Sequence, residues 1–239
     1  MLSFPRRPAL LALFAASLVA PASAAEDGPN KTDAQENNTA RSEAGEGWTT
    51  LFGGESLDAW RGYRKDSIGE GWQAIDGALT RVDNAGDIVT KDKFKAFELV
   101  LEYKIAPGGN SGVMYHVTEE HDVPWKSGPE VQVQDNKAGH DPQKAGWLYQ
   151  LYKSDVDATK PAGEWNELRL VITPDKSEHY VNGVKYFEYD KGSEDWNARV
   201  AKSKFAAFEG FGEVEEGHIA LQDHGNPVSY RNIRIRKLD

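Results

Sequence analysis

A row of polar side chains alternates with valines in the segment spanning residues 128–136. Glu130, Gln132 and Gln134 occupy every second position of this segment. Because successive side chains of a strand point to opposite faces, the carboxyl group and the two amides would share one face. Amides beside a single carboxylate provide directed hydrogen bonds to hydroxyl groups. This row is therefore a candidate sugar-binding surface, and the alternative is an ordinary solvent-facing side of a sheet.

A second polar row is predicted in the segment spanning residues 218–225. Gln222 and His224 lie two residues apart and would share the face opposite to the apolar residues between them. His224 alone would more often be structural. Beside Gln222 and the Asn226-Pro227 turn, it becomes a candidate site residue.

A glycine-rich loop, Gly108-Gly-Asn-Ser-Gly112, leads directly into a further predicted strand. It would deliver Asn110, Ser111 and His116 to one end of the sheet. Since no helix follows the loop, it is not a phosphate-binding cradle. Such loops are also commonly simple turns.

Aromatic residues are the third resource, with seven Trp and nine Tyr in the chain. Most of them must fill the core of a domain of this size. Trp125 and Trp147 flank the Glu130 segment in loop-like sequence, so they are the candidates for stacking on a sugar ring.

Metal ligation is only weakly indicated. None of the six His forms a pair with a zinc-ligand spacing, and His116 and His121 are five positions apart. The sequence therefore requires no cofactor. Calcium on loop carboxylates such as Asp135 or Asp155 stays open, because calcium ligands are often scattered along a chain.

The elements that must position these residues are predicted to be strands. In Phe97–Ile105 every odd position is apolar, which is the period of a strand with one buried face. Asn182-Gly183 predicts a type I′ hairpin turn, and the change of apolar parity near Arg231-Asn232 predicts a β-bulge. Further strands are expected at 112–117, 130–134, 165–173, 178–181, 184–189, 218–223 and 228–236, with one helix at 194–205.

Many short strands and almost no helix predict an all-β jelly-roll sandwich of two antiparallel sheets. The domain is expected to span residues 47–239, because apolar and aromatic residues begin abruptly at Trp48. Residues 25–46 are polar without periodicity and are expected to form a disordered linker. The chain has no cysteine, so its stability must come from core burial.

Residues 1–24 read as a secretory signal peptide, with Arg6 and Arg7 before an apolar run that ends at Ala22-Ser-Ala24. The protein is therefore expected to be exported, to the periplasm or beyond the cell, with no transmembrane segment in its mature form. Removal of the two arginines leaves 26 basic against 38 acidic side chains, a formal charge of −12. Such a charge repels phosphate backbones, so nucleic acid is not an expected partner.

Five motifs occur together in an order that is similar to a known family. The sequence resembles the 3-keto-disaccharide hydrolase domain, a concanavalin A-like β-sandwich found in secreted bacterial proteins, from Gly47 to Leu238. The motifs are Asn110-Ser-Gly112, Gly128-Pro-Glu-Val-Gln132 with Asp135-Asn136, Pro161-Ala-Gly-Glu-Trp-Asn166, Asn182-Gly183, and Leu221-Gln-Asp-His-Gly225 with Tyr230-Arg-Asn-Ile233.

The resemblance implies a hydrolase of glycosides oxidised at carbon 3, with an oxidised disaccharide or glycoside as its carbohydrate partner. Because that chemistry needs a base, a donor to the ketone and a proton source, we predict Glu130 as the base, with His116, His224 or Gln132 polarising the ketone and His140 or Tyr149 as the acid. The substrate-binding residues expected with them are Asn110, Ser111, Gln132, Gln134, Asp135, Gln222, Trp125, Trp147 and Arg231.

Two alternatives remain from the residues. A conventional retaining glycosidase needs two carboxyl groups about 5 Å apart, whereas Gln132 and Gln134 are amides where further acids would be needed. A non-catalytic sugar-binding module would use the same amides and aromatic residues without turnover.

Overall fold

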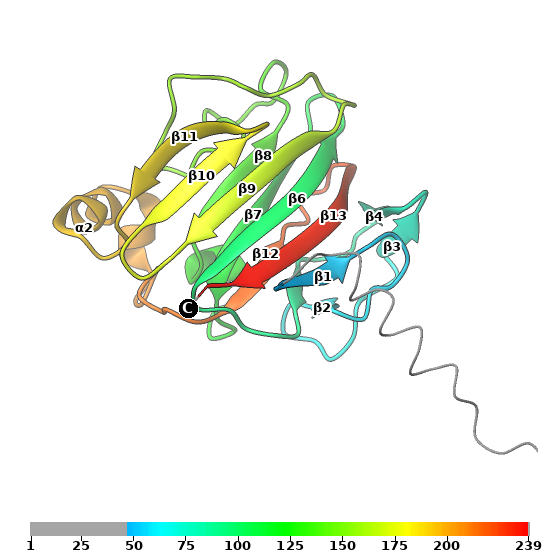
Figure 1. Ribbon diagram of the computed structural model, residues 1–239, viewed down its shortest axis with the longest axis horizontal. Helices are drawn as coiled ribbons and strands as arrows, with labels where there is room; N and C mark the ends of the chain where they lie inside the picture. The colour runs from blue at the N-terminus through cyan, green and yellow to red at the C-terminus, as the bar shows by residue number, and fades with distance from the viewer. Residues whose placement is uncertain (1–46, 239) are drawn as a thin grey trace, which may run out of the picture.

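The computed structural model describes residues 47–238, which fold into two antiparallel β-sheets packed face to face (Figure 1). The predicted signal peptide and linker lie outside the described residues. The strands are β1 (Trp48–Phe52), β2 (Trp60–Gly62), β3 (Trp72–Ile75), β4 (Ala78–Arg81), β5 (Ile88–Thr90), β6 (Phe97–Ile105), β7 (Asn110–Val117), β8 (Glu130–Gln134), β9 (Asn166–Ile172), β10 (Ser177–Val181), β11 (Val184–Tyr189), β12 (His218–Leu221) and β13 (Val228–Lys237).

The larger sheet has the order β11-β10-β9-β6-β13-β4-β3, and β1 pairs with β13 beside this path. The smaller sheet has the order β2-β5-β12-β7-β8. Non-consecutive neighbours in both sheets mean that the chain crosses repeatedly between them, as in a jelly roll. The predicted concanavalin A-like β-sandwich is confirmed.

The core lies between the two sheets because each contributes one apolar face. Leu99 and Leu101 of β6 are fully buried against Val131 and Val133 of β8 and their neighbours. The outer face of the larger sheet is charged instead, and Glu98 there pairs with Arg169 and Arg236. The alternation that marked the strands in the sequence is therefore the alternation between core and surface.

Two local predictions about the strands are confirmed. Asn182 and Gly183 have φ angles of 49° and 79°, the left-handed conformation that a type I′ turn needs at both central residues. In β13 the pairing with β6 shifts between Arg231 and Arg234, and Asn232 has a φ of 52°. This bulge changes which side chains of β13 face the core.

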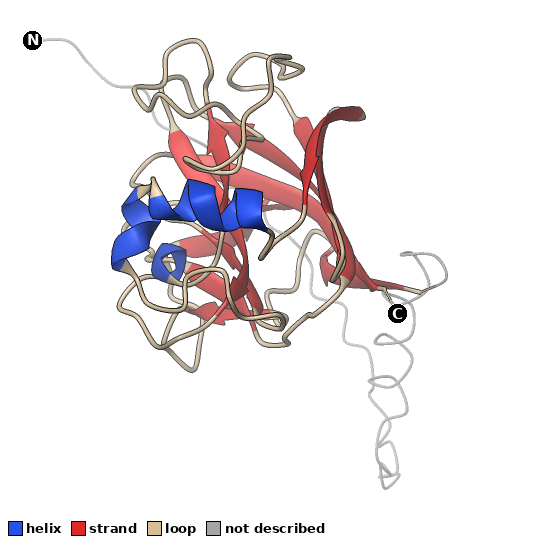
Figure 2. Ribbon diagram, turned by 90° about the vertical axis from the view of Figure 1, so that its left-hand side faces the viewer, coloured by secondary structure: helices blue, strands red, loops and turns tan. Residues whose placement is uncertain are grey.

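The predicted helix at 194–205 is shorter in the structure and divided. Helix α2 (Glu194–Ala201) begins at Ser193, whose hydroxyl accepts a hydrogen bond from the Trp196 amide. The 3-10 helix η2 (Lys204–Ala207) follows as a separate element, because Ser203 caps it anew. Figure 2 shows the helices lying along one side of the two sheets. No helix of the described residues is long and apolar enough to cross a membrane.

Candidate active site

The polar row of β8 lies on the outer face of the smaller sheet. Val131 and Val133 point into the core, so Glu130, Gln132 and Gln134 point away from it. All three polar side chains are nevertheless buried, with exposed fractions of 4%, 1% and 2%. The row is therefore covered by other parts of the chain rather than solvated.

Gly112 leaves a space on this face, called here the Gly112 hollow, and the Glu130 carboxylate fills it. In the register of β7 and β8, Gly112 lies opposite Gln132, and Met114 lies opposite Glu130. A Cβ atom built on Gly112 would lie 2.5 Å from Glu130 Oε1. The position therefore admits no side chain, and the carboxylate occupies the space that one would fill.

The side-chain amides of Gln132 and Gln222 lie beside the Gly112 hollow, and each has an oxygen atom without a hydrogen-bond partner in the part of the chain that the structure describes. Gln132 donates to the Asn110 side chain at 3.1 Å, and the Gln222 side chain lies near enough to Glu130 to lower its pKa. The Oε1 atoms of Gln132 and Gln222 are buried and have no hydrogen-bond partner among the described residues. Buried acceptors of this kind are costly unless a ligand or water supplies donors.

Burial raises the pKa of Glu130 to about 7. The Lys204 ammonium opposes this by lowering the pKa, whereas the negative charge of Asp87 raises it further. No salt bridge reaches Glu130 within the described part of the chain. A carboxyl group with such a pKa is divided between its acid and base forms at neutral pH, which suits proton transfer.

The rim of the site is made by side chains from two loops and η2. The Lys204 ammonium lies 4.4 Å from the ring centre of Trp125 and 4.1 Å from that of Tyr149. Tyr149 donates from its hydroxyl to Asp141 at 2.8 Å, and burial together with this bond raises its pKa. A tyrosine in that state keeps its proton, so Tyr149 is better placed to hold Asp141 than to act as an acid.

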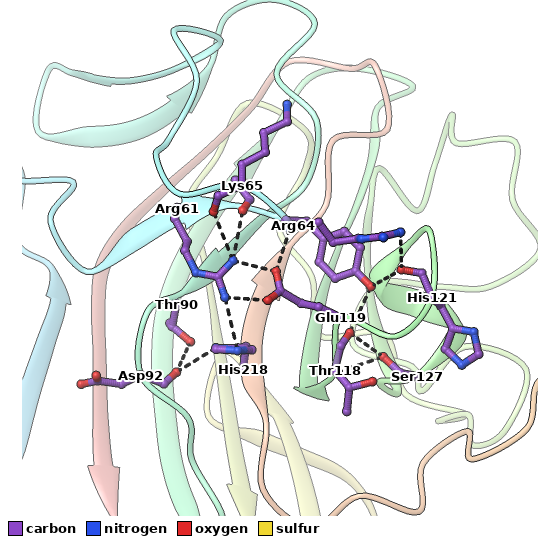
Figure 3. Close-up of polar contacts among 12 residues, drawn as sticks. Arg61, Arg64, Lys65, Thr90, Asp92, Thr118, Glu119, His121, Ser127 and His218 are labelled. Carbon is purple, nitrogen blue, oxygen red and sulfur yellow. Dashed lines mark hydrogen bonds and ion pairs between the residues drawn. The ribbon is translucent and has the colours of Figure 1, made fainter.

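The loop that carries Trp125 is held near its start by the ion pair between Arg61 and Glu119 (Figure 3). Arg61 of β2 donates two hydrogen bonds to Glu119, at 2.6 and 2.9 Å, and its guanidinium also contacts His218 of β12 at 3.4 Å. The hydrogen bonds from Arg61 lower the pKa of Glu119 to about 2. Both charges therefore persist, and they anchor the start of the segment that leads to Trp125.

Asp87 is a site residue that the sequence reading did not single out. It immediately precedes β5 and lies near enough to Glu130 for its charge to affect the Glu130 pKa. Burial raises the pKa of Asp87 itself to about 6. In the sequence, Asp87 stands out only as an acidic residue directly before the short apolar run Ile88-Val89. Many loop carboxylates precede such runs, so this feature does not identify a site residue.

His116 is not part of this site. Its ring packs edge-on against Phe97 and Tyr115 of the core, and it contacts Lys95 O at 2.8 Å and Lys191 Nζ at 3.0 Å. Burial and the Lys191 charge lower its pKa to about 4. The positive φ of His116, 53°, marks a bulge that turns the ring away from the Glu130 face.

His116 instead lines a cavity of about 620 Å³ between α2, η2 and the following loop. Neither Glu130 nor Gln132 lines this cavity. Its volume alone would make it the default ligand site, but the hollow at Gly112 brings together the carboxyl and amide groups that the sequence singled out. We therefore place the candidate active site at Glu130.

Three expected binding residues have structural contacts instead. Ser111 points into the core, where its hydroxyl lies 2.8 Å from that of Tyr230 and donates to the backbone of Gln222 at 2.7 Å. The Gln134 amide donates to the backbone carbonyls of Asp141 and Gln143 and so holds the covering loop. Asp135 accepts from the amides of Gly108 and Lys137, which lowers its pKa.

Of the other expected residues, one lies on the opposite sheet. Arg231 pairs with Glu102 and stacks on Trp165 at 4.1 Å, on the outer face of the larger sheet. The alternation correctly predicted a strand around Arg231, but residue spacing does not show which of the two sheets a strand joins. Its placement away from Glu130 corrects its expected role in binding.

The remaining aromatic and histidine residues divide between rim, core and surface. Trp147 packs against the main core and lines a separate cavity of about 180 Å³, away from Glu130. His140 and His224 are exposed, and the charge of His224 is felt by Asp87. Thus Asn110, Gln132, Gln222 and Trp125 gather around Glu130, whereas His224 lies at the outer margin.

Within residues 47–238, no group of three or more His, Asp or Glu side chains is arranged to hold a metal ion. The carboxylate of Asp135 is occupied by backbone amides, which removes it as a free calcium ligand. Asp155 is exposed beside the smaller cavity.

Fold and site together define a class: an all-β jelly-roll protein with a carboxyl and amide site on the outer face of its smaller sheet. The chain belongs to the family described as the 3-keto-alpha-glucoside-1,2-lyase-like domain, whose model matches residues 47–236. The resemblance drawn from the five motifs is confirmed.

Relatives and solved structures agree with this membership. A 3-keto-disaccharide hydrolase of Bacteroides thetaiotaomicron is 34% identical over 230 residues, which cover 81% of this chain and 79% of the relative. Two crystal structures from Parabacteroides distasonis, described as proposed glycosyl hydrolases, are similar in fold. The first has a TM-score of 0.74 at 33% identity and covers 84% of this chain and 97% of its own. The second has a TM-score of 0.64 at 30% identity, covering 80% and 99%.

Proposed function

We propose that the protein hydrolyses glycosides and disaccharides whose sugar is oxidised to a ketone at carbon 3. The general class, a carbohydrate hydrolase, follows from the family and from the curated relative. The specific substrate is supported by the name of that relative, a 3-keto-disaccharide hydrolase, and by the residues around Glu130. The family description, which names a 1,2-lyase, supports elimination across carbons 1 and 2 as the route.

The chemistry of a 3-keto sugar explains why one base suffices for bond cleavage. The ketone acidifies the hydrogen on carbon 2, so a base removes it and an enolate forms. The glycosidic oxygen then leaves carbon 1, and water adds to the resulting double bond. Such a route needs a base, stabilisation of the enolate oxygen and a proton for the leaving group.

Glu130 is the base in this proposal. The single observation that carries it is a buried carboxyl group with a pKa near 7, held over a glycine hollow between two amide oxygens that lack partners. A base whose pKa lies near the working pH is both available and strong enough to remove a proton. Sugar hydroxyl groups would supply the donors that Gln132 and Gln222 lack.

Lys204 is the candidate for stabilising the enolate oxygen. Its ammonium lies at the rim of the hollow and acts electrostatically on Glu130. A fixed positive charge near a developing oxyanion is worth more in a water-poor site than in solvent. The Gln132 amide is fixed by Asn110, so it orients the substrate beside this charge.

The retaining glycosidase alternative is disfavoured by the geometry of β8. Gln134 is committed to backbone carbonyls, and no carboxyl group replaces it on that strand. Asp87 immediately precedes β5, which is separated from β8 by β12 and β7, so no second carboxyl group alternates with Glu130 on one strand.

Incubation of the purified protein with 3-keto-trehalose tests the proposal against the sugar-binding module. Release of free 3-keto-glucose supports the enzyme, whereas saturable binding without turnover supports the module. Glu130→Gln should lower kcat by at least about 100-fold, as expected for loss of a general base, with an unchanged circular dichroism spectrum. Full activity in that variant would remove Glu130 as the base.

A further inference from the structure

Asp87 lies on the same face of the smaller sheet as Glu130. In the register of β5 and β12, Val89 pairs with Ala220 and Ile88 pairs with Leu221. Val89 and Ala220 pack in the small apolar cluster that also holds Met114, the residue opposite Glu130. Since side chains alternate along a strand, Asp87 shares the face of Val89.

The neighbouring strands complete a row across the sheet at this level. The backbone amide of Gln222 donates to Gly112 O at 2.9 Å, and Gly112 lies opposite Gln132. The order across the face is therefore Gln132, Gly112, Gln222 and Asp87. Gly112 has no side chain, and the Glu130 carboxylate fills the space above it, while Gln222 and then Asp87 follow on the next two strands of the row.

The environment of Asp87 differs from that of the adjacent Asp223. Asp223 pairs with Arg81 and accepts from the amides of Ala85 and Gly86, which makes it a structural carboxylate. Asp87 accepts one bond, from the Asp223 amide to Oδ1 at 2.8 Å, and no salt bridge reaches it in the described residues. Burial raises its pKa to about 6. Asp87 is therefore a carboxyl group without a salt bridge, with one oxygen that accepts no hydrogen bond from the described residues.

We propose that Asp87 is the acid that protonates the leaving glycosidic oxygen, from its position beyond Gln222 in the same row. This inference rests on the proposed function. During elimination the C2–H bond breaks and its proton passes to Glu130. The C1–O bond breaks with its electron pair going to the glycosidic oxygen, which takes the Asp87 proton, and a C1–C2 double bond forms. During hydration a water hydroxyl adds to C1 and its proton returns to Asp87, while Glu130 returns a proton to C2.

Leaving-group dependence tests this assignment. Asp87→Asn is compared with the natural chain on two substrates with the same 3-keto-glucosyl group, one with a sugar and one with 2,4-dinitrophenol as the leaving group. A nitrophenolate leaves without protonation, whereas a sugar alkoxide does not. Asp87→Asn should lower kcat/KM by about 100-fold or more on the disaccharide and by less than about fivefold on the nitrophenyl substrate.

Three comparisons make the outcome decisive. Glu130→Gln should lose activity on both substrates, and Asp92→Asn, at the exposed other end of β5, should lose it on neither. Asp87→Glu retains a carboxylic acid and should recover part of the disaccharide activity, which covers the case that the amide variant folds poorly. Equal losses of Asp87→Asn on both substrates, or none on the disaccharide, would overturn the assignment. If the natural chain turns over neither substrate, the proposed function fails first.

Discussion

Glu130 is a buried carboxyl group without a neutralising partner among the described residues. Its ionisation should therefore lower the free energy of unfolding, and this effect should depend on pH. Its pKa is about 7 in the folded chain against an ordinary value of 4.5. A raised pKa means that the folded state holds the proton more tightly. The contribution to stability is therefore fully present below about pH 4.5 and is lost as pH rises through 7.

Glu130→Gln should consequently gain stability relative to the natural chain as pH rises from about 4.5 to 8. The difference in unfolding free energy between the two should change by about 3 kcal/mol over that range, since each pKa unit corresponds to about 1.4 kcal/mol. Urea denaturation at several pH values measures it. The exposed Glu120→Gln is the control, and a difference that does not vary with pH would contradict the raised pKa.

Gly112→Ala should impair the candidate active site while the protein still folds. The new Cβ would lie 2.5 Å from Glu130 Oε1, so the carboxylate must move out of the hollow. We expect kcat/KM to fall by at least about tenfold, because misplacement of a catalytic group by an ångström is costly. Gly69→Ala, whose Cβ would meet nothing closer than 3.8 Å, should leave kcat/KM unchanged. An equal effect in both variants would remove the special role of Gly112.

At the scale of single residues, the sequence predicts part of the site. The alternation at Glu130 and Gln132 and the spacing of Gln222 place these side chains on outer strand faces, which is where they lie. Asp87 could not be found in this way, because its proximity to Glu130 depends on the order of four strands. Ser111 had the right strand but the wrong face, since it bonds Tyr230 in the core.

Among the elements, the loop between β7 and β8 depends on the Arg61–Glu119 pair. Both side chains are largely buried, with exposed fractions of 18% and 29%, and the hydrogen bonds are bidentate. A double-mutant cycle of Arg61→Gln and Glu119→Gln should give a coupling energy of about 1 to 2 kcal/mol in urea unfolding. The single variants should also raise KM, because the loop carries Trp125 to the rim.

The Lys95–Glu215 pair is the matched control for this cycle. Its exposed fractions are 56% and 69%, so solvent screens the attraction. We expect a much smaller coupling there and no change in KM. A coupling at Arg61–Glu119 no larger than at Lys95–Glu215 would mean that the pair does not anchor the loop.

Long strands could be predicted from the alternation of apolar and polar residues, whereas short strands could not. Strand β6 has the bounds that its nine alternating residues predicted, and the Asn182-Gly183 turn follows from the two residues that tolerate positive φ. Strands β2 and β5 have three residues each, too few for a period to be distinguished from a loop. These short strands carry Arg61 to its ion pair and Asp87 to the site, so part of the site remained hidden with them.

The whole molecule has no disulfide, so contacts between its two sheets must hold it together. Most of these contacts are apolar, but Ser111 of the smaller sheet meets Tyr230 of the larger one at 2.8 Å in the core. The same hydroxyl donates to Gln222 O at 2.7 Å, beside the site. Ser111 therefore links the two sheets through hydrogen bonds in the core, where loss of a polar partner costs stability.

Ser111→Ala should lower the unfolding free energy by about 1 to 3 kcal/mol, because it leaves the Tyr230 hydroxyl and a backbone carbonyl unpaired in the core. The double variant Ser111→Ala with Tyr230→Phe should recover part of that loss, since it removes the orphaned hydroxyl as well. Urea denaturation measures both. At temperatures well below unfolding, kcat/KM of Ser111→Ala should remain within about twofold of the natural chain, because the side chain faces away from Glu130. A large fall in kcat/KM with unchanged stability would instead return Ser111 to the substrate-binding role that its place in the glycine-rich loop predicted.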